Sequence, residues 1–295
     1  MTESPRPTIE RIWLWYLLCV SGVAVCTPSG GSPGHDLTRF FLLHAAVLLA
    51  VLASHWLVMH RSVDAARVPR AALNVIALPA AFTGLCWLLP GVHPEPYEYD
   101  FLALDRALFG IDVGTLADHL APWFVEVLQI CYASFYGICA LAALGAGLGS
   151  GKAAFDRAVL LFAAGFLVSY LGYLLVPTLG PKVVLAFPHD VQGLWFTQTL
   201  RTAIDAGEAN PWDCFPSGHT MMTVTSLIVL WRWNRRWFCW LLLPSVLLIA
   251  STMLLRYHWT IDVLVGALLA WPCARACDWL AARDGWPPLP AIKRA

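Results

Sequence analysis

The sequence predicts an all-α protein that crosses a membrane several times as a polytopic helix bundle. Hydrophobic residues make up 59% of the 295 residues and charged residues only 13%. The mean hydropathy of +0.64 is too high for a soluble domain of this length. The apolar residues are also gathered in runs close to the ~20 residues that a helix needs to cross a bilayer.

These apolar runs follow one another along almost the whole chain. We count about eight of them and predict one transmembrane helix for each. The sixth run is the shortest, and the first is a helix rather than a signal peptide, because no small-residue cleavage site follows it. The runs cover residues 12–27, 39–60, 71–90, 120–148, 154–177, 217–233, 236–255 and 259–281.

Basic residues lie in alternate connections between the runs, which predicts the side that each connection faces. Arg67 and Arg70 lie between the second and third runs, whereas the next connection is acidic. Both termini are therefore expected to be cytoplasmic, with residues 215–220 and 256–262 on the opposite side. The acidic connection also contains apolar residues, and we predict an amphipathic segment over 93–118 that lies in the outer interface.

Composition also narrows the partners and cofactors that the protein is expected to bind. The formal net charge is zero, and the chain has no basic run or repeat, so no nucleic acid partner is expected. The nine cysteines lack the paired spacing of a zinc site. We therefore predict no metal and no cofactor, while the oligomeric state stays open.

The segment Phe215–Thr220 has the features of a helix start that suits an anion. Ser217 is a good N-cap, and Gly218 lets an anion approach the backbone. His219 and an apolar run follow, which is typical of a phosphate site at a helix N-terminus. The alternative is a plain helix cap followed by a polar residue.

A second polar segment, Arg256–Asp262, precedes the last apolar run. His258 and Asp262 are four residues apart, so on a helix they share a face, and the carboxylate accepts a proton from one imidazole nitrogen. A histidine held in this way acts as a nucleophile or base. The alternative is a His–Asp pair at the membrane interface whose two side chains only bond to each other. Ionisable groups at the end of a transmembrane helix nevertheless favour a functional site.

Together, the two segments resemble two of the three signatures of the type-2 phosphatidic acid phosphatase superfamily. Arg256–Asp262 is most similar to the branch with sphingomyelin synthases, inositol phosphorylceramide synthases and many bacterial membrane phosphatases. The resemblance implies a six-helix phosphatase-like core over 71–282, preceded by two transmembrane helices over 1–70 and followed by a cytoplasmic tail over 283–295. It also implies a bacterial inner membrane, with the active site on the periplasmic or extracellular face.

The same resemblance implies a mechanism that needs no metal. His258 is expected to attack phosphorus and form a phosphohistidine, and Asp262 to hold its ring. His219 is expected to protonate the leaving oxygen and then to activate the acceptor.

The basic residues depart from the family pattern. The first signature, a lysine followed by Arg-Pro, is absent, and the nearest basic residue is Lys182. Thr252 replaces the usual arginine six residues before the nucleophilic histidine. We therefore expect the phosphate to be bound by Lys182, Arg256 and the backbone near Ser217 and Gly218.

Three functions are consistent with these residues. Hydrolysis of a lipid phosphate or diphosphate within the bilayer comes first, because water needs no dedicated site. The alternative enzyme is a phospholipid headgroup phosphotransferase, in which a lipid hydroxyl replaces water. The non-enzyme alternative is a transporter or structural membrane protein with an idle motif, which would need a polar pathway across the midplane.

Overall fold

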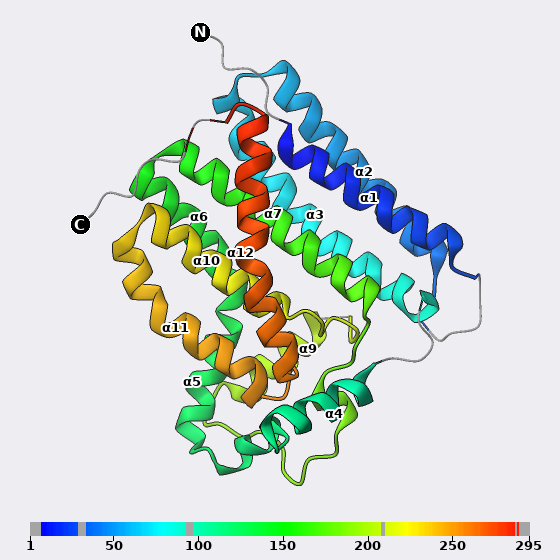
Figure 1. Ribbon diagram of the computed structural model, residues 1–295, viewed down its shortest axis with the longest axis vertical. Helices are drawn as coiled ribbons and strands as arrows, with labels where there is room; N and C mark the ends of the chain where they lie inside the picture. Colours follow the sequence, from blue (N-terminus) through cyan, green and yellow to red (C-terminus); the bar gives the residue numbers. More distant parts are fainter. Residues whose placement is uncertain (1–6, 29–33, 93–96, 208–209, 287, 289–295) are drawn as a thin grey trace.

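The computed structural model describes residues 7–28, 34–92, 97–207, 210–286 and 288. The described chain contains thirteen helices and no β-strand, apart from one isolated bridge between Thr178 and Asp213. The predicted all-α helix bundle is therefore confirmed (Figure 1). The helices are α1 (Thr8–Cys26), α2 (Leu37–His60), α3 (Val63–Val92), α4 (Glu98–Phe109), η1 (Val113–His119), α5 (Pro122–Ala133), α6 (Phe135–Ser150), α7 (Lys152–Leu175), α8 (Pro181–Val184), α9 (Thr197–Gly207), α10 (Gly218–Trp233), α11 (Arg235–Leu254) and α12 (Thr260–Arg283).

Six of the described helices are long and apolar enough to cross a membrane: α1, α2, α3, α7, α11 and α12. The chain is therefore an integral membrane protein. The predicted fourth span is not one straight helix, because α5 and α6 meet at a bend of 56°. Only the two helices together are long and apolar enough to cross a membrane. At the bend, Ser134 Oγ donates a hydrogen bond to the carbonyl of Cys131 (2.6 Å), a contact that competes with the helical ladder.

The predicted sixth span is α10, which has only 16 residues and is shorter than the ~20 that a bilayer requires. It is the central helix of the bundle and contacts α6, α7, α11 and α12. Most of its residues are buried, including Met221 and Met222. Gly165 lets α7 pack closely here, since a Cβ at this position would lie 2.2 Å from Met222 Cε. α10 is therefore shielded by its neighbours along its length.

The first two helices pack against α3 and α7. Glu10 on α1 is buried and forms an ion pair with Arg70 on α3 (2.5 Å), and Ser54 on α2 donates to the same carboxylate (2.6 Å). Three helices thus share one buried charge. α3 begins at Val63, so the predicted boundary at residue 70 falls inside this helix.

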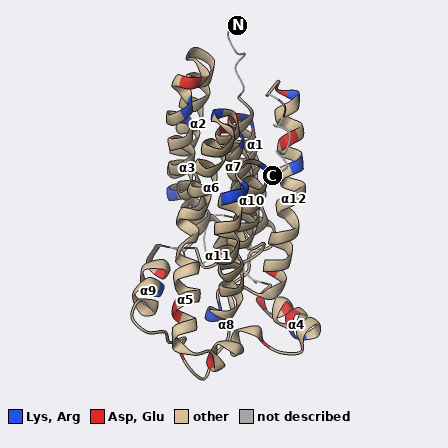
Figure 2. Cartoon of the chain, turned by 90° about the vertical axis from the view of Figure 1, so that its left-hand side faces the viewer, with Lys and Arg blue, Asp and Glu red and all other residues tan. Residues whose placement is uncertain are grey.

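The short helices α4, α8 and α9 lie at one end of the bundle, where acidic residues gather on α4 (Figure 2). The predicted amphipathic segment corresponds to α4 and η1, whereas residues 93–96 lie outside the described residues. α4 exposes Leu104, Leu108 and Phe109 and buries Leu102. The predicted tail over 283–295 lies mostly outside the described residues, because only 283–286 and 288 are described.

Candidate active site

His258 lies in the turn between α11 and α12, and its side chain is buried. Nδ1 lies 3.1 Å from the carbonyl oxygen of Cys214 and 3.6 Å from Oδ2 of Asp262. Because both neighbours are acceptors, the neutral ring carries its proton on Nδ1. Nε2 therefore keeps its lone pair.

The turn that presents His258 is a Schellman motif at the end of α11. Tyr257 N donates to the carbonyl of Thr252 (2.9 Å), and Arg256 N donates to that of Met253 (3.0 Å). Arg256 occupies the left-handed position of the motif with φ 71°, where glycine is usual. The amide of His258 also donates to Thr252 O (2.9 Å), so the backbone holds the histidine directly.

Asp262 belongs to the first turn of α12. Its Oδ2 accepts a hydrogen bond from the backbone amide of the N-cap residue Trp259 (2.9 Å). The same oxygen faces His258 Nδ1. Asp262 thus lies beside the imidazole while it stabilises the start of α12.

His219 lies in the first turn of α10, where Ser217 Oγ accepts from the backbone of Thr220 (3.2 Å). Its ring packs against Tyr132 (centroids 4.7 Å apart, nearly parallel) and against Phe135 (4.1 Å). Nδ1 of His219 lies 3.5 Å from Nε2 of His258. The two histidines predicted from separate segments therefore face each other.

Both histidines border a cavity of about 230 Å³. Lys182, at the start of α8, supplies a positive charge to its wall, and its Nζ pairs with Asp205 Oδ1 (2.6 Å). The ammonium group also lies over the ring of Tyr257, 4.5 Å from the centroid. The other lining residues are Tyr132, Gly180, Val183, Asn210, Pro211, Asp213 and Cys214.

The structure does not bring Arg256 to this cavity. Its guanidinium donates to the carbonyls of Gly114 (3.1 Å) and His189 (2.6 Å) and to Asp118 Oδ1 (2.7 Å). It also packs on the ring of Phe187. All these partners lie in the loops and short helices at the same end of the bundle, so these contacts hold the loops on the turn that carries His258.

Ser217 and Gly218 also lie outside the cavity wall. The amide of Ser217 donates to the carbonyl of Asp262 (3.0 Å). A Cβ on Gly218 would lie 2.4 Å from Tyr173 Oη, so glycine is needed here for packing against α7. Both residues place α10 against its neighbours, and phosphate binding by their backbone stays a prediction.

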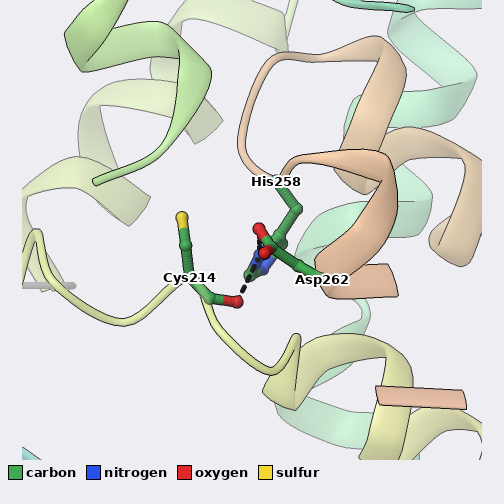
Figure 3. Close-up of side chains that lie close together, drawn as sticks. All are labelled: Cys214, His258 and Asp262. Carbon is green, nitrogen blue, oxygen red and sulfur yellow. Dashed lines mark hydrogen bonds and ion pairs between the residues drawn. The ribbon is translucent and has the colours of Figure 1, made fainter. Parts of the chain in front are cut away.

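Cys214, His258 and Asp262 could together hold a metal ion, because one ligand atom of each lies within 4.8 Å of the other two (Figure 3). The carbonyl of Cys214 is bonded to His258, and its thiol donates to Tyr257 O (3.3 Å). These bonds already occupy the groups that would coordinate an ion. The geometry therefore suits an oriented imidazole, and metal binding would require these contacts to break.

The sequence does not assign three contributors to the site. Cys214 acts through its backbone carbonyl, so its residue type gives no signal. Tyr132 stacks on His219 from α5, which is distant in the sequence, and Asp205 pairs with Lys182 from α9. Only the position of Cys214, directly before the His219 segment, could have drawn attention to it.

Comparison with known proteins agrees with this arrangement. A family model described as the PAP2 superfamily matches residues 99–275, which is more than half of the chain. This chain belongs to the PAP2 superfamily, and a phosphatase-type function follows in general terms. No curated protein and no solved structure matches it.

The matched region runs from α4 to α12 and includes both histidines and Asp262. It begins at residue 99 rather than at residue 71, where the predicted core starts. The superfamily assignment is confirmed, whereas the sphingomyelin synthase-like branch stays a prediction.

The contacts of Arg256 predict a structural role that a pair of variants can separate. Arg256→Ala should lower stability by about 2 kcal/mol or more, because Asp118 and two carbonyls lose a charged donor. Arg256→Gly loses the same contacts but relieves the left-handed backbone, so it should be more stable than Arg256→Ala by about 1 kcal/mol. Thermal unfolding in detergent measures the difference. Unchanged stability with a raised KM would instead return Arg256 to phosphate binding.

Proposed function

We propose that this protein is a membrane lipid phosphatase that hydrolyses a lipid phosphate or diphosphate through a phosphohistidine on His258. One observation carries the proposal: Nε2 of His258 faces Nδ1 of His219 at 3.5 Å beside a cavity, while Nδ1 of His258 is held by two acceptors. Covalent phosphoryl transfer needs a nucleophile and an acid–base group that line the same cavity.

In the first step, Nε2 of His258 forms a bond to phosphorus as the bond to the lipid oxygen breaks. His219 gives its proton to that oxygen, so the leaving group departs as an alcohol or as a shorter phosphate. The phosphorylated ring keeps its Nδ1 proton between Cys214 O and Asp262 Oδ2. The carboxylate thus stabilises the positive charge that develops on the imidazole.

In the second step, His219 takes a proton from water, and the resulting hydroxide attacks phosphorus. The N–P bond breaks, phosphate leaves and His258 recovers its lone pair. Lys182 is the basic residue on the cavity wall, and we propose that it binds the phosphate oxygens in both steps. Its present pairing with Asp205 (2.6 Å) would then be replaced by substrate.

The position of the site suits a substrate held in the bilayer. The cavity lies near the ends of α11 and α12, both of which are long enough to span a membrane. We propose that this end faces the periplasmic or extracellular side, with both termini cytoplasmic. The alternation of basic and acidic connections supports this orientation.

The experiment that tests the proposal compares wild type with His258→Ala on lipid phosphates, prenyl diphosphates and phospholipid–ceramide pairs. Wild type should release phosphate, and His258→Ala should lose on the order of 10³-fold or more in rate, because the covalent step has no nucleophile. His119→Ala is the matched control, since His119 is exposed at the same end of the molecule. Mass spectrometry separates released phosphate from a new phospholipid, which would instead show a phosphotransferase. A folded wild type that gives neither product would contradict the proposal and favour an idle motif.

The acid role of His219 predicts a dependence on the leaving group. His219→Ala should slow hydrolysis of a lipid phosphate by about 10²–10⁴-fold. A nitrophenyl phosphate should be affected much less, because its leaving group needs little protonation. Steady-state rates on both substrates test this. If both fall equally, His219 does not act as the acid.

The same mechanism predicts that chelators leave turnover intact. The proposed steps use only imidazoles, a lysine and a carboxylate, so EDTA should change the rate of phosphate release by less than about twofold. Inhibition by EDTA that one divalent ion reverses would show that a metal takes part. In that case, Cys214, His258 and Asp262 would be the first ligands to test.

A further inference from the structure

The short helix α4 contacts both of the segments that carry the catalytic histidines. Phe101 packs edge-to-face on Phe215, which lies four residues before His219 (ring centroids 5.1 Å apart). Leu102 belongs to a small hydrophobic cluster with Cys214 and Trp259. α4 therefore contacts residues just before His219 and the residue just after His258.

The strongest of these contacts is made by Asp105. Its Oδ2 accepts a hydrogen bond from the backbone of Thr260 (2.7 Å), and its Oδ1 accepts one from Ile261 (3.1 Å). These are the first two residues of α12. Asp105 is buried, with a relative exposure of 4%.

The chemistry of a helix start explains why this contact matters. The first amides of a helix have no partner within it, and the N-cap residue Trp259 has no side-chain acceptor. Asp262 takes the amide of Trp259 (2.9 Å), and Asp105 takes the next two. Two carboxylates at this end also complement the helix dipole. The first turn of α12 is therefore stabilised by Asp105 of α4 as well as by its own residue Asp262.

We propose that Asp105 is a positioning residue for phosphoryl transfer and that α4 braces the His258 and His219 segments at a defined separation. The inference rests on the proposed function, but Asp105 is not among the cavity-lining residues, so it acts through α12. Asp262 and its 3.6 Å contact to His258 lie in the turn that Asp105 holds. If this turn shifts, the imidazole loses its orientation.

The kinetic test uses Asp105→Ala and Asp105→Asn, with Asp100→Asn as the matched control. Asp100 is an exposed acid in the first turn of α4. Asp105→Ala should lower kcat by about 10–10²-fold with KM nearly unchanged, because misplacement by about 1 Å can cost 10²-fold in rate. Asp105→Asn keeps one acceptor oxygen and should fall between wild type and Asp105→Ala. The control should match wild type.

A second measurement does not depend on turnover. Hydrogen exchange, read amide by amide in detergent, should speed up at Thr260 and Ile261 in Asp105→Ala and stay unchanged in the control. Exchange in α7 and α10 should also stay unchanged, which separates a local release from general destabilisation.

Three results would overturn the inference: an unchanged kcat in Asp105→Ala, unchanged exchange at Thr260 and Ile261, or exchange that rises equally in all helices. A wild type without phosphatase turnover would defeat the proposed function alone. The exchange measurement would then still decide whether α4 holds the start of α12.

Discussion

A backbone hydrogen bond joins the starts of the two helices on which the candidate site depends. The amide of Ser217, at the N-cap of α10, donates to the carbonyl of Asp262 in the first turn of α12 (3.0 Å). The close approach needs glycine at 266, where a Cβ would lie 2.5 Å from the carbonyl oxygen of Ser217. With these helix starts side by side, His219 and His258 face each other, although 39 residues separate them in the sequence.

The surroundings of this contact show how an apolar bundle accommodates polar chemistry. Unpaired backbone groups are costly where water is scarce, and the starts of α10 and α12 would leave several amides without partners. Ser217, Asp262 and Asp105 accept hydrogen bonds from these amides. The same residues that satisfy the backbone thereby fix the helix starts next to His219 and His258.

The wall of the cavity carries Lys182 but no arginine among the lining residues that the structure describes. Lys182 is balanced by Asp205, and Asp213 also lies on the wall. Arg256 directs its charge to Asp118 and to the loop carbonyls instead. Its residue type suggested an anion site, but its guanidinium contacts Gly114 O, His189 O and Asp118. The direction of a side chain depends on backbone geometry, which residue identity at a turn does not specify.

The sequence by itself determined the fold class and the residues of the two histidine segments, because hydrophobic runs, helix caps and the four-residue spacing of His258 and Asp262 are local properties. It also located α4, although not its contact with α12. Only the tertiary structure decided that Tyr132 stacks on His219, that Cys214 O lies against His258 Nδ1, and that Asp105 accepts from the first amides of α12. These contacts join residues 44 to 156 positions apart. Packing of distant segments creates them, so no local pattern encodes them.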